Sequence, residues 1–197
     1  MKLILGILGA AIWLYVLHAL TKAKISFWRF LWGSAGLFLL MMFFVRPYVT
    51  MPLAQGVAAV AGFFGDATGT FTPYFRFATI FIPTSSGAMT MQIDFECSGI
   101  LEIMAFLALL AFFEVYTRQE KLLIGLLGIF YIILANALRI ILICEIIHFG
   151  GNSCYNIAHT YIGRIFFYVL SVLLYFYVFT KPQVVKMRVG TFSYDSH

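Results

Sequence analysis

Long apolar runs alternate with short polar stretches along the chain, and this alternation predicts most of its architecture. Several runs are close to the ~20 residues that a helix needs to cross a bilayer. We expect membrane spans at about 3–20, 30–45, 98–116, 122–149 and 158–179. A further run at 52–65 has only about fourteen residues and is interrupted by glycine and proline, so it is expected to be a re-entrant segment or a short span.

Residues 66–96 follow a different pattern. The stretch 75–82 is rich in aromatic and β-branched residues, 83–87 is a turn cluster, and 89–96 alternates apolar with polar residues. Two such runs around a glycine-containing turn predict a β-hairpin-like segment at about 74–96. Since open sheet edges are not tolerated in lipid, the hairpin should lie on a membrane surface.

Composition agrees with the spans. The chain is 62% hydrophobic and 11% charged, whereas a soluble domain has about 25% charged residues. The sequence therefore predicts an all-α polytopic membrane protein, with about five to six transmembrane helices and the hairpin in one integral membrane domain, 1–197. The three cysteines form no CxxC pair, so no metal or other cofactor is expected.

Basic residues predict the orientation. The net charge of +5 comes from short clusters between apolar runs, which is typical of orientation signals and not of nucleic-acid binding. The positive-inside rule places the clusters at 22–29, 118–121 and 181–188 in the cytoplasm, with 181–197 as a cytoplasmic tail. The hairpin and the 150–156 turn are then outside. The N-terminus is outside too if 52–65 does not cross.

This topology brings four polar residues of three helices to the same depth: Cys97, Asn136, Arg139 and His159. Arg139 is the strongest signal, because an arginine at the centre of a span costs roughly 2.5–3.5 kcal/mol on insertion scales. Such a residue usually faces the bundle interior with a partner. The alternatives are snorkelling to the interface, or a structural ion pair with one of three acidic residues, Glu102, Glu114 or Glu145.

Cys97 lies where the third clear span is expected to begin. A helix N-terminus and a nearby arginine both lower a thiol pKa; Asp94 and Glu96 act against this, so their side chains should point away from an activated sulfur. The backbone N–H groups of Ser98, Gly99 and Ile100 are expected to be free to stabilise an oxyanion, and Gly99 permits close approach. The alternative is that Cys97 is a small buried hydrophobe, as Cys144 is expected to be.

His159 is the candidate base at the start of the last span, and Gly163 one turn later should allow close helix contact. His148 is a rival base and Cys154 a rival thiol, since both are expected outside. Asn136 either orients Arg139 or a substrate carbonyl, or makes a helix–helix hydrogen bond.

These motifs occur in a recognisable order: Cys97-Ser98-Gly99-Ile100, then Asn136-Ala137-Leu138-Arg139, then Ala158-His159 before a final helix. The ordered set resembles the exosortase/archaeosortase family, most closely its small exosortase G branch of Gram-positive bacteria, over about 75–180. The resemblance implies a membrane-embedded cysteine protease or transpeptidase, with Cys97 as nucleophile, Arg139 stabilising the oxyanion or thiolate, and His159 as acid and base. Arg164 is a reserve candidate for the third role.

The resemblance also implies partners and a location. The substrate would be an exported protein with a C-terminal sorting signal, cleaved at the outer surface of the plasma membrane and passed to an unidentified envelope acceptor. Membrane lipids surround the enzyme, and no nucleic acid is involved. Two alternatives stay open: a small transporter or channel component with a polar pathway through Arg139, Glu102 and Glu145, and a non-catalytic partner of an envelope glycan system.

Overall fold

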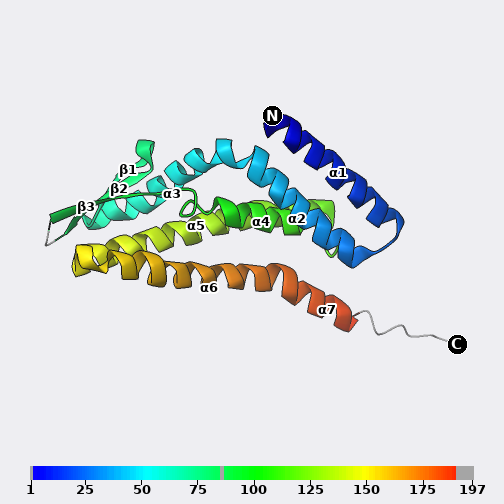
Figure 1. Cartoon of the computed structure of the whole chain (residues 1–197). Helices are drawn as coiled ribbons and strands as arrows, with labels where there is room; N and C mark the ends of the chain where they lie inside the picture. Colours follow the sequence, from blue (N-terminus) through cyan, green and yellow to red (C-terminus); the bar gives the residue numbers. More distant parts are fainter. Residues whose placement is uncertain (1, 85–86, 190–197) are drawn as a thin grey trace.

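The computed structural model describes residues 2–84 and 87–189, and it is largely helical (Figure 1). The helices are α1 (Lys2–Lys22), α2 (Ser26–Phe44), α3 (Arg46–Thr68), α4 (Ile100–Phe112), α5 (Arg118–Gly150), α6 (Gly163–Tyr175) and α7 (Lys181–Val189). Three of them, α2, α3 and α5, are long and apolar enough to cross a membrane, and so is the helical stretch Asn152–Val185 that contains α6. The predicted all-α polytopic membrane fold is confirmed.

A three-stranded antiparallel sheet joins α3 to α4. Its strands are β1 (Thr72–Tyr74), β2 (Thr79–Thr84) and β3 (Gly87–Gln92), in the order β1-β2-β3. The predicted hairpin is β2–β3, with Thr79 opposite Gln92; Ser85 and Ser86 of its turn lie outside the described residues. The stretch 75–77 is a 3₁₀ turn, η1 (Phe75–Phe77), and Ala78 has a left-handed φ of 49°. The predicted first strand was therefore wrong at its start, because this turn folds residues 72–74 back as an additional strand.

Capping decides where α5 begins. The Thr117 hydroxyl accepts a hydrogen bond from the Glu120 N–H at 3.4 Å, and the Glu120 carboxylate accepts one from the Thr117 N–H at 2.7 Å. This reciprocal capping box satisfies two otherwise unpaired donors. The helix consequently starts at Arg118, four residues before the predicted start at 122.

The other helix next to the predicted site is shorter than expected. α4 covers Ile100–Phe112, inside the predicted span 98–116. Gly99 precedes it with a φ of 79°, a left-handed conformation that glycine adopts without strain. The sequence led us to expect Cys97 directly at the N-terminus of a helix that begins at 98. Because α4 begins at Ile100, Cys97 lies instead in the turn ahead of the helix.

The last helical stretch changes its hydrogen-bonding pattern twice. After the short turn η2 (Asn152–Cys154), the chain forms a π-helical segment η3 (Ile157–Ile162), then α6, then a second π-helical segment η4 (Phe176–Thr180). These segments follow one another without a break into α7. The predicted tail is thus helical to Val189, and residues 190–197 are outside the described part.

Two levels of packing follow one another along α5. Its first half packs on α4, where an added Cβ at Gly128 would lie 2.1 Å from the Phe106 ring. Its second half, with Ile140, Ile143 and Ile147, shares a buried cluster with α3 and the sheet, including Ala58. The 33 residues of α5 extend for about 50 Å, whereas the hydrocarbon core of a bilayer is about 30 Å thick. Only one of the two levels fits inside that layer.

We call the level with strands β1–β3 the sheet end (Figure 1). At the opposite end α2, α5 and α7 begin, and Arg29, Arg118, Lys121 and Lys181 lie in their first turns. We call this the basic end. In Figure 1, α2 and α3 follow one another lengthwise, α2 towards the basic end and α3 beside the sheet. If the bilayer surrounds α2 and α4, then α3, which contains residues 52–65, lies at the level of the sheet. Whether 52–65 enters the membrane stays a prediction.

The packing of α4 on α5 makes a prediction about stability. Gly128→Ala should lower the free energy of unfolding by about 1–3 kcal/mol, because the buried Phe106 ring would have to shift against Tyr175 and Phe179, on which it packs. Thermal unfolding in detergent measures it. Gly56→Ala is the matched control: an added Cβ there meets nothing within 4 Å, so this change should be neutral or stabilising. Equal melting temperatures for both variants would contradict the packing.

Candidate active site

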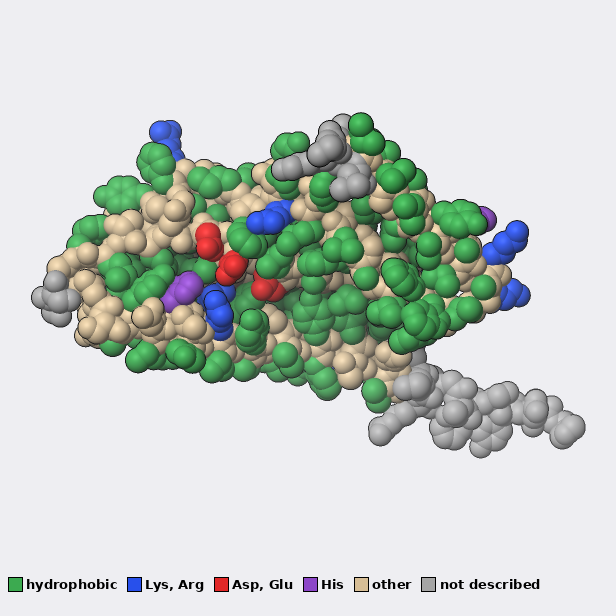
Figure 2. All heavy atoms as spheres, viewed as in Figure 1, with side chains coloured by type: hydrophobic (Ala, Val, Ile, Leu, Met, Phe, Trp, Pro, Cys, Tyr) green, Lys and Arg blue, Asp and Glu red, His purple; other side chains and the backbone are tan. Residues whose placement is uncertain are grey.

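Charged side chains gather at the boundary between the two levels. Figure 2 shows them as one cluster on a surface that is otherwise mostly apolar. A cavity of about 280 Å³ lies at this position. Its lining comes from the turn before α4, from α4 itself, from α5, and from η3 and α6: Phe95, Glu96, Cys97, Leu101, Glu102, Arg139, His159, Arg164, Phe167 and Tyr168.

Cys97 and His159 form the centre of the cluster. The Cys97 Sγ lies 3.1 Å from the His159 Nε2, although 62 residues separate them in the chain. His159 belongs to the π-helical segment η3, and such segments often occur at functional sites. Its ring stacks on Tyr155, with centroids 5.4 Å apart and planes 10° apart. The imidazole is thus held in position for proton exchange with the thiol.

Arg139 reaches the same sulfur from α5. Its Nη2 lies 3.9 Å from the Cys97 Sγ, and its guanidinium carbon lies 5.6 Å from the centre of the Phe167 ring. The residue is only 5% exposed, and its Nε has no hydrogen-bond partner among the described residues. The guanidinium therefore keeps one unused N–H donor in a residue that lines the cavity.

The ion-pair alternatives for Arg139 are not found in the described part of the chain. Glu114 pairs with Arg29 near the basic end. Glu145 accepts a hydrogen bond from the Thr70 hydroxyl at 2.6 Å. Glu102 lines the cavity, but its Oε2 has no hydrogen-bond partner among the described residues. Within the described residues, Arg139 is thus a buried cation with no carboxylate in a salt bridge to it, which is costly unless something else uses it.

Asn136 holds the backbone of the nucleophile candidate. Its side-chain Nδ2 donates a 2.6 Å hydrogen bond to the Cys97 carbonyl. Gly99 lies against the same amide, since an added Cβ would be 3.5 Å from Asn136 Nδ2. The predicted roles were to orient Arg139 or a substrate carbonyl, or to bond another helix. The observed contact is a different one: Asn136 fixes the turn that carries Cys97.

Ser98 closes the turn from the other side. It is fully buried, and its hydroxyl donates to the Phe95 carbonyl at 2.9 Å and accepts from the Ile100 N–H at 3.4 Å. The Ile100 N–H is therefore not free for an oxyanion, contrary to the expectation from the sequence. Arg139 is a further donor beside the sulfur.

Burial raises the pKa of the Cys97 thiol to about 11; the charge of Arg139 opposes this shift, and Asp94 and Glu96 add to it. The Asp94 carboxylate does not point away, because its Oδ1 accepts a hydrogen bond from the Cys97 N–H at 3.0 Å. The predicted lowered pKa was therefore wrong. The resting thiol is protonated at neutral pH, and it needs an adjacent base to become a nucleophile.

The alternative base, His148, and the alternative thiol, Cys154, contact backbone carbonyls outside the cavity. The His148 Nδ1 lies 2.6 Å from the Pro83 carbonyl, and the Cys154 thiol donates to the Gly150 carbonyl at 3.2 Å. Cys144 is buried in the core, as expected. Gly163 allows the close helix contact that was predicted, because an added Cβ would lie 2.6 Å from Ile143.

Several cavity residues were missed by reasoning from the sequence: Phe95, Leu101, Phe167 and Tyr168. Phe95 also lies under Arg46, whose guanidinium carbon is 4.0 Å from the ring centre. Phe167 and Tyr168 follow Arg164 by three and four residues, so helical spacing would have placed them on the same helix face as Arg164. The Arg46–Phe95 contact joins the start of α3 to the turn, and no local pattern indicates it.

Fold and site together define a polytopic membrane protein with a cysteine–histidine pair and a buried arginine at one level of the bundle. The chain matches the transmembrane exosortase family over residues 2–176, and it belongs to that family. The match includes the N-terminal helices, beyond the region 75–180 that carries the motifs. No curated protein and no solved structure matches the chain. Assignment to the small exosortase G branch stays a prediction.

The surroundings of the thiol predict a pH dependence. Asp94→Asn should lower the pKa of Cys97, because it removes a negative charge that disfavours the thiolate, and alkylation by iodoacetamide should then rise at lower pH. Arg139→Gln should move the profile to higher pH. The modified Cys97 peptide can be quantified by mass spectrometry in a Cys154→Ala background.

The matched control for this experiment is Asp66→Asn, which removes an exposed carboxylate of α3 that has no part in the shift at Cys97. Its profile should coincide with that of the parent. A profile for Asp94→Asn that is unchanged or moves to higher pH would contradict the described electrostatics.

Proposed function

We propose that this exosortase-family protein is a cysteine transpeptidase or protease whose nucleophile is Cys97. The observation that carries the proposal is the 3.1 Å contact between Cys97 Sγ and His159 Nε2, with the guanidinium of Arg139 beside the same sulfur. Acyl transfer needs a nucleophile, a proton shuttle and a group that stabilises developing negative charge. The three side chains supply these functions in one cavity.

The first half of the reaction forms a thioester. His159 Nε2 takes the thiol proton, and the sulfur attacks the carbonyl carbon of the scissile peptide bond. The negative charge that develops on the carbonyl oxygen is stabilised by the N–H donors of Arg139. The C–N bond then breaks, and the imidazolium gives its proton to the departing amine. This role requires that Nε2 is the unprotonated ring nitrogen at the start.

The second half of the reaction releases the acyl group. An acceptor amine or a water molecule loses a proton to His159 as it attacks the thioester carbonyl. The C–S bond breaks, and the thiolate recovers a proton from the imidazolium. Because the resting thiol is protonated, catalysis depends on His159 at both steps, unlike an enzyme with a preformed thiolate.

The proposed substrate is an exported protein with a C-terminal sorting signal, and the proposed acceptor is an envelope molecule. The basic residues Arg118 and Lys121 support a cytoplasmic position for their end of the bundle. In that orientation the cavity would lie near the outer surface of the plasma membrane. About 27 Å of helix separates Arg118 from Asn136 at 1.5 Å per residue, close to the thickness of the hydrocarbon layer.

The transporter alternative requires a polar pathway through Glu102, Arg139 and Glu145. Glu145 is engaged by Thr70, away from the cavity that Arg139 and Glu102 line. The contact pattern therefore favours the enzyme. The contact pattern does not distinguish the enzyme from a non-catalytic partner of an envelope glycan system. The following experiment does.

Cys97→Ala should abolish formation of the thioester, with a loss of roughly a thousandfold or more, because no other nucleophile reaches the acyl group. Arg139→Lys should cost roughly a hundredfold, since one ammonium does not reproduce the guanidinium donors at the oxyanion. Both are measured by trapping the acyl-enzyme from cells and identifying the attached peptide by mass spectrometry.

Cys154→Ala is the control for Cys97→Ala, since it removes a thiol outside the cavity and should leave the thioester yield unchanged. Membrane protein levels of every variant are compared by immunoblot. Normal processing by Cys97→Ala at normal protein levels would rule out the nucleophile role.

Orientation has a separate test. In a Cys154→Ala background, Ser153→Cys should react with a membrane-impermeant maleimide added to intact cells. Gln119→Cys should react only after the membrane is permeabilised, because the basic end is cytoplasmic. The background chain without either new thiol corrects for labelling of Cys97. Labelling of Gln119→Cys in intact cells would mean that the proposed orientation is inverted.

A further inference from the structure

Glu102 carries a polar atom that the proposed reaction does not use. The residue lies in the first turn of α4 and lines the cavity of Cys97. Its side chain is half-buried, and the Oε2 atom is buried without a hydrogen-bond partner among the described residues. A buried polar atom without a partner destabilises a fold, so proteins retain few of them. One that lines the cavity of a reactive thiol is therefore a candidate for contact with a substrate.

Arg139 does not occupy this oxygen. The charge of Arg139 acts on the Glu102 carboxyl, and both residues line the cavity. No salt bridge joins the two side chains in the part of the chain that the structure describes. The Nε of Arg139 also has no hydrogen-bond partner there. One cavity thus holds an unused acceptor and an unused donor.

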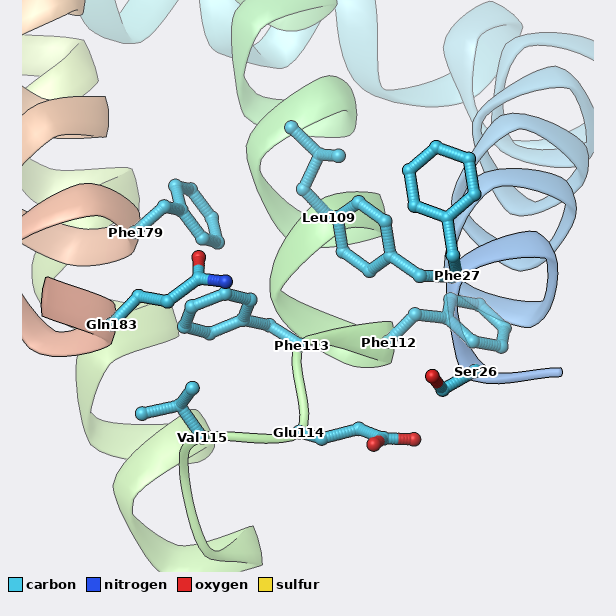
Figure 3. Close-up of a pocket in the computed structure, with 10 residues that line it drawn as sticks. Ser26, Phe27, Leu109, Phe112, Phe113, Glu114, Val115, Phe179 and Gln183 are labelled. Atoms are coloured by element: carbon cyan, nitrogen blue, oxygen red, sulfur yellow. The ribbon is translucent and has the colours of Figure 1, made fainter. Parts of the chain in front are cut away.

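The other carboxylates beside a cavity differ from Glu102. Asp94 accepts a hydrogen bond from the backbone of the nucleophile candidate. Glu96 lines the same cavity but is exposed to solvent. Glu114 lines a larger hollow of about 640 Å³ (Figure 3), and there it forms a salt bridge with Arg29. Among the described residues, Glu102 is thus the carboxylate with a buried, unused oxygen.

The proposed reaction brings a nitrogen atom into this cavity twice. In the first half the amine of the scissile bond departs, and in the second half an acceptor amine attacks the same carbonyl carbon. Because attack by an amine on the thioester is the chemical reverse of thioester formation, the two nitrogens occupy the same position. Arg139 holds the carbonyl oxygen in this scheme, so the hydrogens on nitrogen need another partner. A carboxylate oxygen accepts from them.

The lining of the cavity suits a cationic amine. Its two arginines and two glutamates have formal charges that sum to zero, so net charge does not exclude a cation. A hydrogen bond between an ammonium and a carboxylate is charge-assisted and about twice as strong as one between neutral groups. Apolar walls for a short alkyl group come from three further residues of the lining: Leu101, Phe167 and Tyr168.

We propose that Glu102 is the acceptor subsite of this transpeptidase: it binds the ammonium group of a primary alkylamine and thereby favours transfer of the acyl group to that amine over hydrolysis. The inference rests on the proposed function, because it assigns the second half of that reaction. Water has no positive charge for the carboxylate to hold, and it gains less from the contact.

The acceptor loses two protons during transfer. An ammonium must lose one proton before its nitrogen can attack, and the Glu102 carboxylate that binds it is the base in contact with it. The neutral amine then attacks the thioester carbonyl, and His159 takes the second proton. The C–S bond breaks, and the thiolate of Cys97 takes that proton from the imidazolium. Glu102 releases the first proton to water, so the products are an amide, the thiol and one proton.

The test measures which acceptor receives the acyl group. The full-length protein is acylated at Cys97 by a short peptide thioester in the presence of propylamine, and the amide and acid products are quantified by mass spectrometry. Glu102→Gln should lower the ratio of amide to acid about tenfold, which corresponds to about 1.4 kcal/mol. The rate of acylation should not change, because the thiol that leaves the thioester has no N–H for Glu102 to accept.

Glu145→Gln is the matched control. It removes a carboxylate charge outside the cavity, and the new amide can still accept the hydrogen bond from the Thr70 hydroxyl. Its product ratio should equal that of the parent. Propanol is the matched acceptor without a positive charge, and Glu102→Gln should leave the yield of its ester unchanged. An amide ratio that Glu102→Gln does not alter, or an equal loss of amide and ester, would overturn the proposal.

A second measurement needs no catalysis and no variant of Glu102. Propylammonium bound at Glu102 should slow the alkylation of Cys97 by iodoacetamide in the parent protein, whereas propanol at the same concentration should not. Equal rates with both additives would contradict the subsite. The melting temperature of Glu102→Gln shows whether that variant folds.

The two proposals fail separately. Normal acylation of the parent by the thioester, with a product ratio that does not depend on Glu102, would refute the acceptor subsite alone. Absence of acylation in the parent would refute the catalytic role of Cys97. Protection of the thiol by propylammonium would in that case still show an amine site in the cavity.

Discussion

The length of α5 is the constraint on which the rest of the structure depends. Its 33 residues extend for about 50 Å, and a bilayer interior of about 30 Å cannot contain them all. The helix therefore has two sets of neighbours, α4 towards the basic end and α3 with the sheet at the other end. Arg139 lies near the change from one set to the other. A cation that is costly in the hydrocarbon layer is thus placed where polar groups meet the edge of that layer.

The turn before α4 is held tightly, although it lies outside regular secondary structure. Asn136 bonds the Cys97 carbonyl, Ser98 bonds the backbone on both sides of it, and Gly99 takes the left-handed conformation that redirects the chain into α4. Each of these bonds satisfies a buried polar group that would otherwise be costly. Together they fix the direction of the Cys97 side chain towards His159. The guanidinium of Arg139 is buried, and among the described residues no carboxylate forms a salt bridge with it, so its burial is costly to the stability of the fold.

The electrostatics of the thiol indicate how such a site avoids side reactions. Burial and the two neighbouring carboxylates keep the sulfur protonated, so it is a poor target for oxidants and alkylating agents at rest. Activation then requires the imidazole of His159 at 3.1 Å. The acidic Asp94, which is unexpected beside a nucleophile, has a structural role as acceptor for the Cys97 N–H.

The sequence by itself determined the helical membrane class, the β2–β3 hairpin and the set of polar residues at one depth. These follow from local rules: the length of apolar runs, alternation along a strand, and the cost of placing Arg139 in a span. It did not determine the start of α4, the 3₁₀ turn at Phe75–Phe77, or the shift of the thiol pKa. Those depend on contacts between distant segments, such as Asn136 with the Cys97 carbonyl and the burial of Cys97 by three elements.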